Sequence, residues 1–329
     1  MILSALDTSP VPSGAAPGEA ARNTIDLARH CEAIGFHRYW VAEHHNAGAL
    51  GSAAPEIMIA AIAAATRRIR VGSGGIMLPN HAPLKVAEVF RLLESLYPAR
   101  IDLGVGRAAG TDNRTALALR QARELLGADA FPAQLDELLA YLSHEPDPAA
   151  AFGPIKAVPT GITPPPVLVL GSGVDSAALA GRLGLGFAYA HGFAPDGYAD
   201  ALRAYRAAFV GDRPWAILYV SVICASDASA AEELARAADL ASLRFGQGLR
   251  DLPFPTIAEA AAHTFDADED TLRQGARAAR VCGEPALVAD RLHAMLAASG
   301  ADELMIGTSI HDHEERKRSY DRVLAVLAA

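Results

Sequence analysis

The sequence predicts an α/β fold, a (β/α)8 TIM barrel with an insertion after its seventh strand, formed by one domain over residues 1–329. Short runs rich in valine and isoleucine alternate with longer stretches of helical periodicity, which is typical of β–α units around a parallel sheet. Neither a repeat nor a low-complexity linker divides the chain. A barrel commonly uses a chain of this length as a single unit, so we expect one domain.

The predicted strands are short and apolar, and each is followed by at least one stretch with the period of a helix. They cover residues 2–6, 38–42, 69–76, 101–105, 167–170, 187–190, 217–225 and 303–307. Eight strand–helix units fit a closed barrel better than an open doubly wound sheet.

The predicted helices follow the strands in order. They cover residues 20–33, 55–66, 85–96, 114–126, 131–142, 176–183, 198–209, 228–245, 285–298 and 314–327. Residues 246–284 interrupt the alternation. Because long excursions in compact barrels are commonly lids, we expect this insertion to be a mobile cover.

Composition and charge exclude several classes of partner. The chain is 51% hydrophobic and 20% charged, and its net charge of -9 without a dense basic run argues against nucleic acid or an anionic membrane as a partner. The longest lipid-like stretch, residues 57–65, is too short to span a bilayer. Three widely spaced cysteines and an amino terminus without a basic segment lead us to expect a cytoplasmic protein.

An acid and two histidines, Glu43, His44 and His45, follow the second predicted strand, where barrel enzymes place their active sites. Neighbouring side chains on a strand point to opposite faces, so only one histidine can face the barrel axis. We assign this position to His44, as a proton donor or acceptor that titrates near neutrality. Glu43 and His45 are expected to orient it or to line the wall. The alternative is a satisfied polar network of all three residues at the barrel rim.

A glycine-rich turn, Gly171-Ser172-Gly173, follows the fifth predicted strand. Its backbone N–H groups, the hydroxyls of Ser172 and Ser176 and the start of a helix together form a candidate phosphate cradle. Arg107, after the neighbouring fourth strand, supplies a guanidinium that can hold a phosphate through two hydrogen bonds. A dinucleotide site fits poorly because the third glycine and the ribose-binding acid are missing, and a plain tight turn is the other alternative.

A metal site is the competing use for the histidines. His311 and His313 after the eighth strand could add ligands to His44 and His45, but adjacent histidines diverge and no cysteine is near. Asp312 and Glu315 form a capping pattern at the start of the last helix. We therefore expect no metal, and we expect His311 to face the bound ligand or substrate.

Five blocks of the sequence, in this order along the chain, resemble one protein family. They are RYWVAEHHN (38–46), RIRVGSGGIMLPNHAPLKVAE (68–88), RIDLGVGRAAGTD (100–112), PPVLVLGSGVDSA (165–177) and GADELMIGTSIHDHEERKRSY (300–320). The family is that of the bacterial luciferase-like, flavin-dependent monooxygenases, which use FMN or coenzyme F420. The chain looks most similar to the branch of single-gene luciferase-like monooxygenases.

The resemblance implies roles for individual residues. His44 is then the catalytic histidine beside the reactive edge of the flavin, and Gly74-Gly75 forms a non-proline cis peptide under the flavin ring. The further cofactor-binding residues are Arg107, Gly171, Ser172, Gly173, Ser176 and His191. Gly106 and His191 stand where the luminescent enzyme has cysteine and tryptophan, so light emission is not expected.

The resemblance also implies the reaction. Reduced FMN, supplied by a separate NAD(P)H:flavin reductase, reacts with O2 to form a C4a-peroxide that oxidises a small apolar organic substrate. The alternatives are an F420-dependent hydride-transfer oxidoreductase and a non-catalytic flavin-binding barrel. From the residues themselves we expect a homodimer, because the helix at 55–66 is apolar nearly all round and must be covered on both sides.

Overall fold

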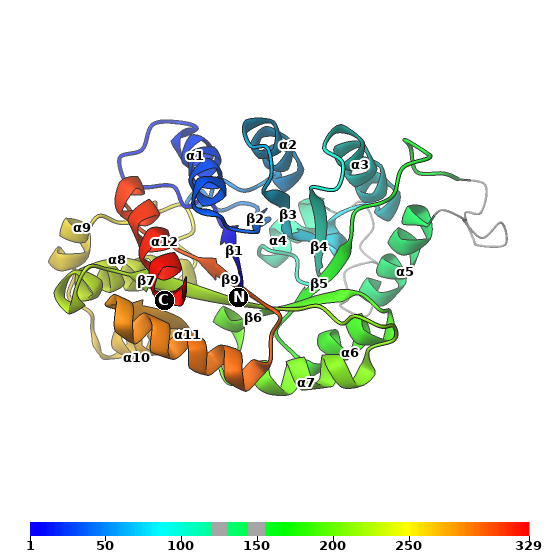
Figure 1. The fold of residues 1–329 in the computed structure, drawn as a ribbon. Helices are drawn as coiled ribbons and strands as arrows, with labels where there is room; N and C mark the ends of the chain where they lie inside the picture. The colour runs from blue at the N-terminus through cyan, green and yellow to red at the C-terminus, as the bar shows by residue number, and fades with distance from the viewer. Residues whose placement is uncertain (120–129, 144–154, 329) are drawn as a thin grey trace.

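The strands of the computed structural model form a closed parallel barrel surrounded by helices (Figure 1). The structure describes residues 1–119, 130–143 and 155–328. Within them, the barrel closes in the order β1-β2-β3-β4-β5-β6-β7-β9, with β9 paired to β1. The strands are β1 Ile2–Asp7, β2 Arg38–Val41, β3 Arg70–Met77, β4 Ile101–Gly106, β5 Val167–Gly171, β6 Gly186–Ala190, β7 Ala216–Cys224, β8 Arg280–Gly283 and β9 Glu303–Gly307. The predicted barrel and its eight strands are therefore confirmed.

The helices lie outside the barrel (Figure 1). They are α1 Glu19–Ile34, α2 Pro55–Ala65, α3 Pro83–Leu96, α4 Asn113–Leu119, α5 Phe131–Leu142, α6 Val174–Arg182, α7 Tyr198–Ala208, α8 Ala228–Gly246, α9 Ile257–Ala262, α10 Ala267–Ala278, α11 Pro285–Ser299 and α12 His313–Ala328, with the 3-10 turns η1 Leu78–Asn80 and η4 His191–Phe193. All ten predicted helices are present. The predicted helix at 114–126 is confirmed only as α4, because residues 120–126 lie outside the described part of the chain.

The alternation of side chains along the strands produces two separate apolar layers. On β2, Tyr39 and Val41 belong to the main cluster between the strands and the helices. Trp40 and the following Ala42 belong to a second cluster with residues from strands all around the barrel. Side chains from opposite strands can meet only in the interior, so the even-numbered positions of β2 point into the barrel.

The insertion after the seventh strand is confirmed, but it contains regular elements that the prediction of a mobile cover did not include. Helices α9 and α10 and the short strand β8, which pairs in parallel with β7, lie between α8 and α11. Both helices begin with a capping box, Thr256 with Glu259 and Asp266 with Glu269. Each box satisfies two backbone groups that a short helix would otherwise leave unpaired.

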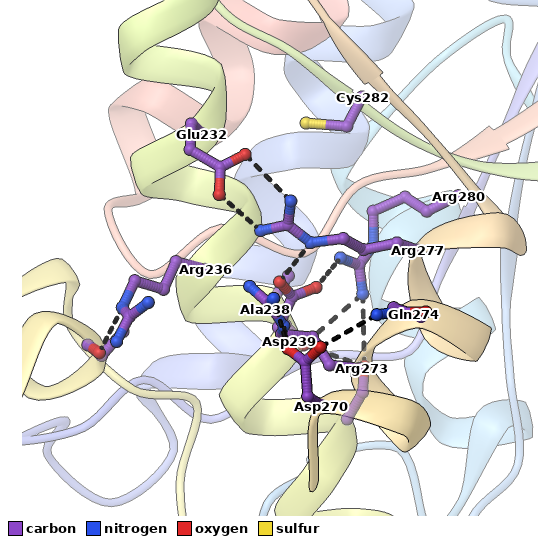
Figure 2. Close-up of polar contacts among 12 residues, drawn as sticks. Glu232, Arg236, Ala238, Asp239, Asp270, Arg273, Gln274, Arg277, Arg280 and Cys282 are labelled. Atoms are coloured by element: carbon purple, nitrogen blue, oxygen red, sulfur yellow. Dashed lines mark hydrogen bonds and ion pairs between the residues drawn. The ribbon is translucent and has the colours of Figure 1, made fainter. Parts of the chain in front are cut away.

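Ion pairs hold the insertion to α8 (Figure 2). The fully buried Asp239 of α8 accepts from Arg277 Nε at 2.6 Å and from Arg280 Nη1 at 3.0 Å. Glu232, which lies nearer the start of α8, forms a two-bond pair with Arg277 at 2.7 and 2.9 Å. Hydrogen bonds to Glu232, followed by those to Asp239, raise the pKa of Arg277. Two carboxylates of α8 thus anchor α10 and β8.

Among the described residues, no helix combines the length and the apolar character that crossing a bilayer requires.

Candidate active site

The parallel pairing brings the carboxyl ends of β2, β3, β4 and β5 to one end of the barrel. Val41 is level with Ser73, Met77 with Gly106, and Gly106 with Leu170. The residues that follow these strands therefore lie around this end of the barrel, which we call the barrel mouth. They include Glu43 to His45, Arg107 and the Gly171 turn.

Several groups at the barrel mouth bond to the carboxylate of Glu43. Its fully buried carboxylate accepts the Met77 N–H at 2.7 Å, His45 Nε2 at 2.6 Å and His81 Nε2 at 2.8 Å. Burial alone would raise the pKa of Glu43, but these hydrogen bonds, chiefly those from His45 and His81, lower it to about 2. Glu43 is therefore ionised at neutral pH, and it ties the segment after β2 to the end of β3.

His81 is the partner of Glu43 that the sequence analysis did not select. Burial lowers the pKa of His81, but the hydrogen bond to Glu43 outweighs burial and raises it. His81 follows the η1 turn directly after β3, so its position next to a strand end was the available signal. The role expected for Glu43 and His45, as orienting or wall residues, remains a prediction.

Glu43, His45 and His81 are also a group that could hold a metal ion, since their ligand atoms lie within 4.8 Å of one another. Here these atoms are joined by hydrogen bonds. The metal ligands considered from the sequence, His311 and His313 beside His44 and His45, bond elsewhere. His311 Nε2 lies 3.0 Å from Ser13 O, and His313 Nε2 lies 2.9 Å from Asp26 Oδ2. Asp312 caps α12 by accepting the Glu315 N–H at 2.7 Å, as expected.

His44 differs from its neighbours because its imidazole lacks a partner. Its backbone N–H donates to Ser52 O at 3.0 Å, but the buried Nδ1 has no hydrogen bond to any described residue. His44 lies just beyond the end of β2, between Glu43 and His45, whose side chains bond to each other. A buried nitrogen without a partner is uncommon, and it suits a position that a ligand completes.

The expectation that His44 titrates near neutrality is wrong. Burial lowers the pKa of His44 to about 4, and the nearby positive charges of His45 and Arg250 act in the same direction, against the carboxylate of Glu43. The sequence could not show this, because burial results from the packing of the whole mouth. The imidazole is neutral at pH 7 and can accept a proton there.

The peptide bond between Gly74 and Gly75 is cis, as the resemblance implied. A Cβ on Gly74 would lie 2.6 Å from Leu6 Cδ1, and one on Gly75 would lie 2.9 Å from Gly104 O. At Gly75 the neighbour is the backbone of β4, so a side chain there would force the two strands apart. The two residues form a flat stretch of backbone at the mouth, without side chains.

The candidate phosphate site lies at the ends of β4 and β5. Arg107 is exposed, and the pairing of Gly106 with Leu170 places it beside the Gly171-Ser172-Gly173 turn. Gly173 is the N-cap of α6, and the space around its Cα is open. The Ser176 hydroxyl donates to Gly173 O at 2.9 Å, so it must rotate before it can donate to a phosphate.

His191, the other predicted cofactor residue, follows β6, the strand that pairs with β5. Its side chain is buried, its ring centroid lies 5.6 Å from that of Tyr198, and its Nδ1 has no partner among the described residues. Burial lowers the pKa of His191, so it is neutral at pH 7. Its role toward a cofactor remains a prediction.

His311 lies after β9 and bonds to the segment that follows β1 through Ser13 O. It lines a mostly apolar cavity of about 280 Å³ between α8, α9 and the segment that precedes α12. Glu43, His44 and His45 are not among the described residues that line this cavity. A role for His311 in a substrate pocket stays a prediction.

The chain is similar to known proteins over most of its length. A family model described as luciferase-like monooxygenase matches residues 1–303. The chain is 38% identical over 329 residues to a luciferase-like monooxygenase of Escherichia coli strain K12, with 98% of this chain and 96% of that protein covered. It is 36% identical over 212 residues, 64% of this chain and 63% of the relative, to an N-acetyl-S-alkylcysteine monooxygenase of Bacillus subtilis.

Solved structures share the fold. The crystal structure of apo-MsnO8 is similar with a TM-score of 0.87 and 38% identity, over 99% of this chain and 98% of the other. Two more distant structures contain cofactors. The oxygenating constituent of 3,6-diketocamphane monooxygenase from Pseudomonas putida, in complex with FMN, has a TM-score of 0.69 and 19% identity over 98% of this chain and 96% of the other. The structure of an F420-dependent secondary alcohol dehydrogenase in complex with an F420-acetone adduct has a TM-score of 0.72 and 15% identity, over 99% of this chain and 98% of the other.

Proposed function

The chain belongs to the luciferase-like monooxygenase family, and we propose that it is an FMN-dependent monooxygenase supplied with reduced flavin by a separate NAD(P)H:flavin reductase. One atom of O2 enters a small, largely apolar organic substrate, and the other leaves as water. The bound reduced flavin supplies the two electrons that this reaction consumes.

The observation that carries the proposal is the unpaired Nδ1 of His44. This nitrogen is buried, belongs to a neutral imidazole and lies just after β2 at the barrel mouth. A neutral imidazole accepts a hydrogen bond or a proton at its free nitrogen, which suits proton transfer during oxygen activation. Glu43 acts beside it by fixing the backbone between β2 and β3.

The residues present fit FMN. The exposed guanidinium of Arg107 and the free N–H groups at the start of α6 would hold the phosphate, with the open Gly173 turn leaving room for it. The backbone of Gly74-Gly75 would lie against the ring. Burial of His44 would keep water away from the reacting edge.

The test is a titration followed by an activity assay. FMN and coenzyme F420 are each titrated against the protein with the fluorescence of the cofactor as readout. The better cofactor is then supplied in reduced form, with O2 and a set of thioethers, aldehydes and ketones. We expect FMN to bind more tightly, and we expect His44→Ala to abolish oxygen transfer while FMN affinity remains.

Each alternative has its own outcome in this test. Tighter binding of F420 and hydride transfer without O2 would support an F420-dependent oxidoreductase. FMN binding without any turnover, unaffected by His44→Ala, would support a non-catalytic flavin-binding barrel. Rapid stoichiometric NADH oxidation by the protein alone would contradict the need for a separate reductase.

A cytoplasmic location stays a prediction. We also propose that the protein is a homodimer. Helix α2 exposes Ile57, whose accessible fraction is 66%. The adjacent helix α3 exposes Leu92 at 52% and Leu96 at 60%. Apolar side chains of this size on neighbouring helices favour burial against a second copy of the chain.

A further inference from the structure

An arginine of the insertion, Arg250, lies at the barrel mouth next to the segment that follows His44. Its guanidinium has no hydrogen-bonded partner among the described residues. Its backbone carbonyl accepts the Ala49 N–H at 2.8 Å, and the carboxylate of the next residue, Asp251, accepts the Gly48 N–H at 3.1 Å. The insertion is therefore fastened to the segment that follows Glu43 and His44. Arg250 is held in place through its main chain, and its side chain is not needed for this.

The same stretch of the insertion is also fastened to the segment after β1. Phe254 N–H donates to Val11 O at 2.8 Å, and Ser13 N–H donates to Phe254 O at 2.8 Å. Val11 N–H in turn donates to Ala49 O at 2.9 Å. Residues 250–254 thus form one layer with the segments after β1 and β2, which fixes where Arg250 emerges.

The carboxylate that pairs with Arg250 takes its hydrogen bonds from other groups. Asp112 forms a long ion pair with Arg250, with 3.9 Å between Asp112 Oδ2 and Arg250 Nη1, and this separation is beyond hydrogen-bond distance. The Asp112 carboxylate instead accepts the backbone N–H groups of Arg114 and Thr115, the Thr115 hydroxyl and, at 3.4 Å, the Asn46 amide. These hydrogen bonds, that of the Thr115 N–H first, lower the pKa of Asp112.

The guanidinium of Arg250 is partly withdrawn from water but keeps its N–H groups free. Its side chain is 29% exposed, and its Cζ lies 5.2 Å from the centroid of the Phe245 ring. It forms no hydrogen bond with any residue that the structure describes. Arginine presents five donors in a planar fork that matches a carboxylate, so a half-buried guanidinium with unused donors suits an anionic ligand.

We propose that Arg250 binds a carboxylate of the substrate and thereby determines which substrates the enzyme accepts. The substrate is then a small molecule with one carboxylate and an otherwise apolar body. The identification of the bound molecule as a substrate rests on the proposed monooxygenase function. The carboxylate-binding site itself depends only on Arg250. Because Arg250 is fastened to the segment that follows His44, a substrate held by its carboxylate would place its apolar part at the barrel mouth, where oxygen transfer would occur.

A pair of probes that differ only in charge tests this proposal. We would use an N-acetyl-S-alkylcysteine and its primary amide, with thermal stabilisation of the protein and dissociation constants as binding readouts. In the wild type the acid should bind and stabilise, and the amide should bind much more weakly. Arg250→Gln should weaken binding of the acid about 10- to 100-fold, the range for losing charge-assisted hydrogen bonds, without changing binding of the amide.

Control variants separate a carboxylate site at Arg250 from a general effect of surface charge and from damage to the cofactor site. Arg250→Lys should retain part of the affinity for the acid. Arg114→Gln, an equal change of charge at an exposed residue of the neighbouring segment, should leave it unchanged. FMN affinity should survive Arg250→Gln but fall in Arg107→Gln.

The proposal is overturned if the wild type binds the acid no better than the amide, or if Arg250→Gln binds the acid as the wild type does. It is also overturned if Arg250→Gln weakens FMN binding as much as Arg107→Gln, because Arg250 would then hold the cofactor phosphate. Acid-selective binding that depends on Arg250, without any oxygen transfer, would leave the carboxylate site standing and refute the proposed reaction instead.

Discussion

The low pKa of His44 makes the stability of the protein depend on pH in a specific way. The folded imidazole has a pKa of about 4, whereas an unfolded histidine titrates near 6.5. Between these values the unfolded chain binds more protons than the folded one, so stability falls as the pH falls. Above pH 6.5 both forms are neutral and the effect is absent.

The magnitude follows from the two pKa values. Between pH 7.5 and pH 5, His44 should reduce the free energy of unfolding by about 2 kcal/mol. With an unfolding entropy of roughly 2 cal/mol/K per residue over 329 residues, this corresponds to a fall of about 3 °C in the midpoint of thermal unfolding. His44→Gln removes the titrating group, so the midpoint of this variant should fall by about 3 °C less than that of the wild type.

The assay is thermal unfolding followed by circular dichroism at pH 7.5, 6.5, 5.8 and 5.0, without added flavin. The raised pKa of His81 acts in the opposite direction, retaining stability at low pH, but it is present in both proteins and cancels in their difference. His293→Gln, at an exposed position of α11, is the control and should follow the wild type. Parallel curves for the wild type and His44→Gln would refute the reasoning that burial suppresses protonation of His44.

Three further predictions concern the fold and the assembly. Asp239→Asn should lower the free energy of unfolding by about 3 kcal/mol, because Arg280 loses the buried carboxylate that neutralises it, and an unchanged thermal midpoint would contradict the ion-pair anchor of the insertion. Gly104→Ala should destabilise the protein by about 2 kcal/mol or more, since its Cβ would lie 2.1 Å from Ser73 O, whereas Gly192→Ala has open space and should unfold as the wild type does. Light scattering at micromolar concentration should give a dimer for the wild type and a monomer for Ile57→Glu, and a monomeric wild type would disprove the proposed interface.

Much of the barrel was predictable because its signals are local. Each strand is a short apolar run between turns, and the alternation along β2 separates Tyr39 and Val41 from Trp40 and Ala42. The helices and strand of the insertion escaped prediction for a physical reason. Helix α10 has no buried residue and a mostly polar sequence, so it offers few apolar positions by which a helix is recognised. Its capping box, Asp266 with Glu269, was the local signal that could have revealed it.

The connections within the site were not predictable from spacing. Glu43 binds His81 across 38 positions of the chain, and Arg250 reaches the His44 segment only because the insertion folds back over the mouth. The pKa of His44 depends in the same way on packing that no short motif encodes. The protonation state of His44 and the partners of Glu43 depend on the assembled barrel mouth.

A crystal structure of the protein with bound FMN tests the central claim most directly. We predict the phosphate within hydrogen-bond distance of Arg107 and the Ser172-Gly173 turn, the ring against Gly74-Gly75, and Nδ1 of His44 facing the reactive edge of the flavin. FMN bound elsewhere, or with its ring remote from His44 while the phosphate occupies the turn, would contradict it.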